Sequence, residues 1–115
     1  MATVQQCRAA LDVLATKLAR VEPELRARHV PERSVTCYVS DLDVVFGCRL
    51  DEHGVHDLVE GEPAEPADLR VTMASKVLLG LASGEEDFLS AWLRGRVHVS
   101  ASMRDLLRLR SLFGL

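Results

Sequence analysis

Aromatic residues are scarce in this sequence, and their scarcity limits the kind of core it can build. Rings make up 4% of the 115 residues, namely Tyr38, Phe46, Phe88, Trp92 and Phe113. Hydrophobic residues still account for 48%, so a core must be filled with Leu, Val, Ala and Met side chains. Such side chains suit either a closely packed core or an aliphatic cavity. The length suffices for one hydrophobic core, so we expect residues 1–115 to form a single domain.

The sequence also lacks the charge and the apolar runs of several protein classes. Its formal net charge of −3 argues against nucleic-acid binding, which needs a basic face to neutralise phosphates. No apolar run approaches the roughly 20 residues of a membrane span, and the N-terminus lacks the basic-then-apolar pattern of a signal peptide. Cys7, Cys37 and Cys48 are odd in number and widely spaced. We therefore expect reduced thiols in a cytoplasmic protein.

Motifs for nucleophilic catalysis, nucleotide binding and metal binding are absent as well. There is no G-x-S-x-G sequence and no glycine loop of the P-loop or dinucleotide type, so we expect no cofactor. Residue types that bind metals do gather at Asp51, Glu52, His53, His56 and Asp57. A structural zinc site needs four converging ligands, whereas these residues are spread over a turn and a strand. We interpret them as solvated turn residues and expect no metal.

The sequence begins with the pattern of an amphipathic helix. Thr3 and Gln6 have the spacing of a capping box, in which each side chain bonds an amide at the helix start. Apolar residues then recur at helical spacing: Val4, Cys7, Leu11, Leu14, Leu18 and Val21. We interpret this stripe as a lid packed on a sheet, with Cys7 as a small buried hydrophobe.

Alternating apolar residues predict five strands after this helix. The strands are centred on residues 35–39, 44–50, 55–59, 69–73 and 97–101. A turn near Asp41-Leu42 would set Cys37 opposite Phe46, with Cys48 as its diagonal neighbour. Diagonal neighbours lie roughly 7–8 Å apart, too far for a disulfide. Both cysteines are therefore interpreted as core residues.

Two short helices and a terminal helix complete the predicted elements. Ser75 and Ser102 stand where they could cap helices, and Gly84 and Gly95 stand where helices should end. The predicted order is α-β-β-β-β-α-α-β-α, which is an α+β fold class with a five-stranded, mostly antiparallel sheet covered by helices.

The terminal helix has an unusually wide apolar surface. Its apolar residues span an arc of roughly 220°, against the ~100° stripe of an ordinary surface helix: Met103, Leu106, Leu107, Leu109, Leu112 and Phe113. The part of this arc that exceeds an ordinary stripe must be covered by a ligand, by a partner subunit or by more of this chain. The alternative is that the helix is simply well buried. Arg110 falls inside the arc, so it either extends to water or binds an anion such as a carboxylate or phosphate headgroup.

Nearly the whole chain, and best the stretch from Val44 to Phe113, resembles the sterol carrier protein 2-like (SCP2-like) domain. The matching positions are Ala67-Asp68 leading into Val71 and Met73, Gly84 closing a helix, Ala91 four residues before Gly95, and Gly95-Arg96-Val97 opening a strand. The family usually follows that strand with Gly-Asp or Gly-Asn, where this sequence has Ala101-Ser102. The resemblance implies binding or transfer of a sterol, fatty acid or fatty acyl-CoA in a cavity between the sheet and its helices, with the C-terminal helix as a wall.

We therefore expect non-catalytic binding of an apolar small molecule by a monomer or a homodimer. The expected ligand-binding residues, inferred from the faces of helices and strands, are Val71, Met73, Leu78, Leu81, Phe88, Trp92, Met103, Leu106, Leu107, Arg110 and Phe113. Affinity would come from burial, at roughly 25 cal/mol per Å² of apolar surface.

Two other functions remain open. The cavity could host a cyclisation or isomerisation of a hydrophobic metabolite, and the general acid or base would then be His56, His98, Asp57 or Tyr38. Alternatively, the terminal helix could pair with another protein or with itself.

Charge is distributed unevenly along the chain. Residues 51–68 contain acidic side chains and no basic one, whereas arginines gather near the C-terminal end, at Arg94, Arg96, Arg104, Arg108 and Arg110. This is either a solvated dipolar surface or a basic edge that contacts anionic membranes transiently during lipid delivery.

Overall fold

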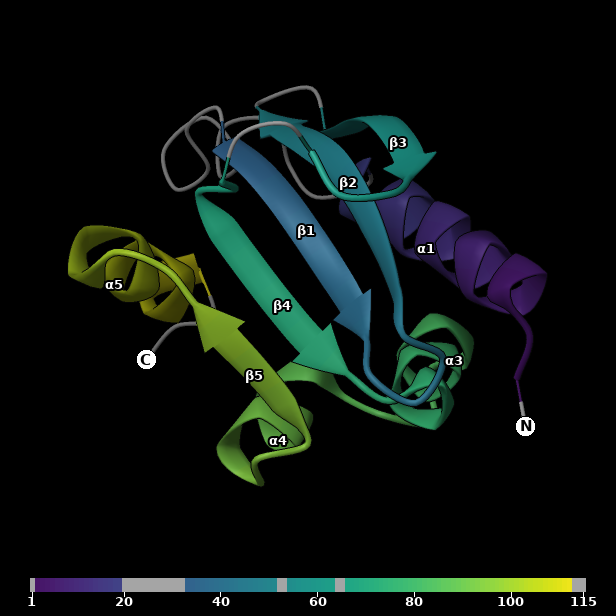
Figure 1. Ribbon diagram of the computed structural model, residues 1–115. Coiled ribbons are helices and arrows are strands. Elements are labelled where there is room, and N and C mark those ends of the chain that lie inside the picture. Colours follow the sequence, from purple (N-terminus) through teal and green to yellow (C-terminus); the bar gives the residue numbers. More distant parts are fainter. Residues whose placement is uncertain (1, 20–32, 52–53, 64–65, 113–115) are drawn as a thin grey trace.

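The computed structural model describes residues 2–19, 33–51, 54–63 and 66–112 (Figure 1). In chain order its elements are α1 (Val4–Ala19), β1 (Arg33–Val39), β2 (Val44–Asp51), β3 (Gly54–Glu60), β4 (Leu69–Met73), α3 (Ser75–Ser83), α4 (Phe88–Leu93), β5 (Val97–Ser100) and α5 (Met103–Leu112). The predicted α+β order of elements is confirmed.

The strands form one sheet in the order β3-β2-β1-β4-β5. Neighbouring strands are antiparallel except for β1 and β4, which are parallel. The chain crosses from β3 at one edge to β4 on the far side of β1, so β1 occupies the centre. The sheet is therefore mixed but mostly antiparallel, as predicted.

The strand register gathers the alternating apolar residues on one face of the sheet. Cys37 pairs with Phe46 on β2, as the hairpin prediction required, and with Val71 on β4. Val39 pairs in the same way with Met73. Residues of this face form one core with residues of α1, α3 and α4. Figure 1 shows α1 and α3 next to each other, while α4 and α5 lie near the two ends of β5.

The start of α1 has the predicted capping box. The Thr3 amide donates to Gln6 Oε1 at 2.8 Å, and the Gln6 amide donates to Thr3 Oγ1 at 3.1 Å. Cys7 is fully buried, in agreement with its interpretation as a small core residue. The stripe on α1 therefore faces the sheet and α3, although the side chain of Leu18 and all of Val21 lie outside the described residues.

The start of α3 differs from the prediction, because Ser75 does not cap the helix with its own side chain. Asp41, in the turn between β1 and β2, accepts from the Ser75 amide at 2.8 Å and from its hydroxyl at 2.6 Å. These hydrogen bonds lower the pKa of Asp41. The first turn of α3 is thus held by a carboxylate from the turn between β1 and β2.

The other helix ends follow local rules. Gly84 ends α3 with φ of 88°, and Gly95 has φ of 77° after α4, a region that favours glycine. Asp87 caps α4 by accepting from the Ser90 amide at 3.0 Å. Ser102 caps α5 as predicted, accepting from the Asp105 amide at 3.2 Å.

A β-bulge interrupts the predicted alternation of apolar residues along β3. The register shifts between Gly47 and Arg49 of β2, opposite Asp57, whose φ is 55°. After this bulge Leu58 packs against the core, whereas Val59 is 57% exposed. A bulge inserts an extra residue and turns the following side chains to the other face.

Helix α5 is anchored at the start of β1 by a charge pair. Arg33 Nε lies 3.1 Å from both carboxylate oxygens of Asp105, which is buried. Arg33 precedes Val35 by two residues, so it lies on the helix-covered face of the sheet. Within the described ranges, no helix has the length and apolar character needed to cross a membrane.

Candidate functional site

A cavity of about 560 Å³ lies between the helix-covered face of the sheet and the helices. Its walls come from α1 (Leu11, Leu14, Ala15), from four strands (Val35, Cys37, Phe46, Cys48, Val55, Leu58, Val71, Met73) and from α3 (Leu78, Leu81). The segment between α3 and α4 adds Gly84, Glu86 and Asp87, and α4 adds its first residue, Phe88. Most of these side chains are hydrocarbon or thiol.

The cavity arises because buried side chains fill one end of the helix-covered face of the sheet and leave space beyond that end. Val39 and Val97 of the sheet and Leu78 of α3 are at most 1% exposed and belong to one buried core, and Leu78 also borders the cavity. The neighbouring row of the sheet, where Cys37 pairs with Val71, borders the cavity instead. Apolar walls around empty volume favour an apolar guest over water, which needs polar partners.

The predicted ligand-binding residues fall into three groups. Val71, Met73, Leu78, Leu81 and Phe88 line the cavity. Trp92 packs on the core beside Phe88, with ring centroids 6.0 Å apart, but does not line it.

The remaining predicted residues belong to the C-terminal part of the chain. Met103 is 72% exposed and Leu107 is 54% exposed, so both point away from the cavity. Leu106 is half-buried and is also not part of the cavity wall. The side chain of Arg110, and Phe113 altogether, lie outside the described residues. Contact of these residues with a ligand stays a prediction.

The sequence-based prediction missed the walls contributed by α1 and by the first three strands. The signal was present, since Leu11 and Leu14 belong to the apolar stripe of α1, and Val35 shares a face with Cys37. The same pattern also describes ordinary core residues, so it does not mark a cavity. Glu86 carried no signal in the sequence.

The cavity thiols are poor nucleophiles. Burial raises the pKa of Cys37 to about 12, and burial also raises the pKa of Cys48. The thiolate is the reactive form of cysteine, and at neutral pH both groups are therefore protonated. All three cysteines are free.

The predicted acid–base residues do not line this cavity. Tyr38 and His98 pair with Thr72 in neighbouring strands and share the opposite face of the sheet. Tyr38 donates to Asp43 Oδ1 at 2.8 Å, and this hydrogen bond raises the pKa of Tyr38. Asp57 is exposed at the bulge.

Metal-ligand types do not converge in the part of the chain that the structure describes. No group of three or more His, Cys, Asp or Glu side chains there is placed to hold an ion. Glu52 and His53 of the predicted cluster lie outside the described residues.

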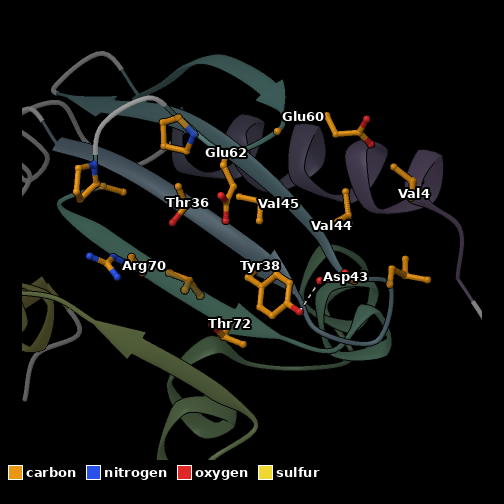
Figure 2. A pocket seen from close by; sticks show the side chains of 16 residues that line it. Val4, Thr36, Tyr38, Asp43, Val44, Val45, Glu60, Glu62, Arg70 and Thr72 are labelled. Carbon is orange, nitrogen blue, oxygen red and sulfur yellow. Dashed lines mark hydrogen bonds between the residues drawn. The ribbon is translucent and has the colours of Figure 1, made fainter.

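A second hollow, of about 990 Å³, lies on the opposite face of the sheet. Figure 2 shows Thr36 and Tyr38 of β1 and Arg70 and Thr72 of β4 projecting into it, with Glu62 nearby. Its lining mixes these polar side chains with apolar ones such as Val44 and Val45, whereas the wall of the cavity under the helices is almost wholly apolar. The cavity under the helices is the better site for an apolar ligand.

One end of the cavity carries charge. Glu86 lines this end and forms an ion pair with Arg96 Nη1. The Glu86 side chain is 18% exposed and that of Arg96 is 39% exposed. Asp87 lines the same end while capping α4.

Comparison with known proteins finds structural similarity to solved structures. No protein-family model and no curated protein matches this sequence. Among solved structures, the UbiJ-SCP2 ubiquinone synthesis protein is 23% identical over 92% of this chain and 90% of that chain, with a TM-score of 0.62. Palmitated SCP2L2 from Aedes aegypti is 16% identical over 96% of this chain and 94% of that one, with a TM-score of 0.60.

An enzyme contains a similar module. The inverting sec-alkylsulfatase Pisa1 from Pseudomonas sp. is 20% identical over 89% of this chain, with a TM-score of 0.58. The match covers only 15% of the sulfatase. Together with the strand order and the helix-covered sheet, these likenesses show that this chain has the fold of SCP2-like domains.

Proposed function

We propose that this domain binds an apolar small molecule in the cavity beneath its helices and carries it without changing it chemically. The ligand belongs to the class that includes sterols, fatty acids and fatty acyl-CoA. The observation that carries the proposal is the cavity of about 560 Å³ on the helix-covered face of the sheet. Ligand pockets in proteins typically measure roughly 300–1,000 Å³.

The solved structure of palmitated SCP2L2 supports this ligand class, because that protein has the same fold and holds a fatty acyl chain. Carriage is favoured over chemistry because the two carboxylates in the described wall, Glu86 and Asp87, are engaged by Arg96 and by the Ser90 amide. His56, His98, Asp57 and Tyr38 do not line the cavity, and Cys37 is protonated at neutral pH because burial raises its pKa to about 12. A general acid or base must reach the proton it transfers.

A chain-length series of primary alcohols tests the proposal. Each methylene buried in the cavity should add about 0.8 kcal/mol, which is about fourfold in Kd. Isothermal titration calorimetry with octanol, decanol and dodecanol should therefore show affinity rising about 15-fold for each pair of added carbons. The proposal would be refuted if no alcohol of the series bound detectably, or if the affinity did not change with chain length.

We further propose that the outward surface of α5 contacts anionic membranes during ligand delivery. Met103 and Leu107 are largely exposed, and Arg104 is exposed beside them. Apolar side chains flanked by cations suit a surface of anionic lipid. The basic edge predicted from the sequence continues to Arg108 and Arg110, whose side chains lie outside the described residues.

Co-sedimentation with phosphatidylserine-containing vesicles tests the membrane contact. Wild-type protein should bind at low salt and be released as salt is raised, and Met103→Ser/Leu107→Ser should bind less. Val59→Ser is the matched control, because Val59 is similarly exposed on β3. Binding by the double variant equal to wild type would contradict the proposal. If the vesicles do not bind and wild type sediments as a dimer that the double variant abolishes, α5 is a subunit interface instead.

A further inference from the structure

The charged side chains that the described residues contribute to the cavity wall have one sign. Among the described residues that line it, the charged side chains are Glu86 and Asp87, both acidic and both in the segment between α3 and α4. Since every other described wall residue is apolar, a thiol or glycine, the polar end of an amphiphilic ligand would meet this segment.

Glu86 is held in place by three contacts. Its amide donates to the carbonyl oxygen of Gly80 at 3.0 Å. Its side chain lies so close to α3 that a Cβ added at Gly80 would stand 2.5 Å from Glu86 Cγ. Its carboxylate is paired with Arg96. Gly80 thus provides the space in which Glu86 reaches the end of the cavity.

Arg96 is the cation that pairs with Glu86, so its charge is already engaged. Arg96 lies next to β5 and is not part of the cavity wall. Asp87 is equally fixed, because it accepts from the Ser90 amide at 3.0 Å. A ligand carboxylate at this end would meet two negative groups, whereas a hydroxyl could donate to Glu86.

We propose that Glu86 makes this cavity select lipids with a neutral, hydrogen-bond-donating polar end and discriminate against carboxylates. This inference rests on the proposed function and narrows its ligand class. Glu86 acts in two ways: its charge repels an anion, and its pairing with Arg96 removes the cation that would otherwise attract one.

Three probes of equal chain length separate these effects: dodecanol, methyl dodecanoate and dodecanoate, each titrated calorimetrically at pH 8. Wild type should bind dodecanol at least tenfold more tightly than dodecanoate, with the methyl ester between them. Dodecanoate binding as tightly as dodecanol would overturn the inference while leaving the proposed function intact. Failure of all three probes to bind would instead refute the proposed function.

The variant Glu86→Gln removes the carboxylate and releases Arg96. It should raise the affinity for dodecanoate at least tenfold and weaken dodecanol binding severalfold. Affinity for methyl dodecanoate should stay within twofold, which reports an intact cavity. Adding Arg96→Gln should abolish the gain for dodecanoate. Glu85→Gln is the matched control, because Glu85 is exposed in the same segment and does not line the cavity.

The single variant Arg96→Gln keeps the test decisive if Glu86→Gln does not fold. Glu86 would then keep its charge without a counter-ion, and dodecanoate affinity should fall at least threefold below wild type while dodecanol affinity holds. An unchanged ratio of dodecanol to dodecanoate affinity in either variant would overturn the inference.

Discussion

Replacing Leu14 with Trp tests directly whether the space beneath α1 is empty. Leu14 lies on the cavity wall, so the larger indole should enter the cavity and displace no neighbour. In a closely packed core, added bulk typically costs about 1–3 kcal/mol. A Trp side chain buries roughly 150–250 Å², which at about 25 cal/mol per Å² exceeds the contribution of Leu by about 2–3 kcal/mol.

Burial areas taken from a folded structure are upper bounds. The free energy of unfolding of Leu14→Trp should therefore lie between the wild-type value and about 2 kcal/mol above it. In a domain of this size, that is a rise in Tm of up to about 8 °C. Dodecanol affinity should fall at least tenfold, because the indole occupies the ligand's volume.

Urea denaturation and calorimetric titration check both outcomes. Val13→Trp is the matched control, since Val13 is the preceding residue of α1, is 44% exposed and does not line the cavity. It should change stability by less than about 0.5 kcal/mol and leave affinity unaltered. A loss of 1 kcal/mol or more in Leu14→Trp, with cooperative unfolding retained, would show that the space is filled and would refute the reasoning.

Three further outcomes follow from the core, the α3 cap and the thiols. Leu78→Ala should destabilise the fold by about 2–5 kcal/mol in urea denaturation, because Leu78 is fully buried in the core; a loss below 1 kcal/mol would contradict its placement. Asp41→Ala should be less stable than wild type at pH 7. This difference in the free energy of unfolding should shrink as pH falls through the ordinary carboxyl pKa of 3.8 and below, because the hydrogen bonds from Ser75 lower the pKa of Asp41. A difference that stays constant from pH 7 to pH 2.5 would count against the cap. Iodoacetamide at pH 8 should alkylate Cys37 in the unfolded chain but only slowly in the native protein, since burial raises its pKa to about 12; rapid native labelling in a mass-spectrometric time course would show an accessible thiolate.

The fold could be predicted from the sequence where local patterns and the sheet face agree. Alternation set Cys37 opposite Phe46, and helix spacing placed Cys7 against the sheet; both placements are confirmed. Contacts between distant segments could not be predicted this way. The cap that Asp41 provides to Ser75 spans 34 residues, and the pair between Arg33 and Asp105 spans 72.

The candidate site could be predicted only in part, for a physical reason. Residues that line a cavity and residues that fill a core have the same polarity and the same spacing, so Val71 and Val39 look alike in the sequence. Only the positions of α1 and α3 over the sheet decide which of them borders empty space. Glu86 reaches the cavity because Gly80 leaves room for it, a relation that composition does not reveal.

The parallel pairing of β1 with β4 has a consequence during synthesis on the ribosome. Once the chain has emerged as far as Glu60, the three-stranded meander of β1, β2 and β3 can form, because its pairings are antiparallel and sequential. At that stage β1 is a bare edge, with its outer amides and carbonyls free to join a strand of another nascent chain. Arrival of Leu69–Met73 closes that edge, so β4 protects the newborn chain from aggregation as well as completing the wall of the cavity.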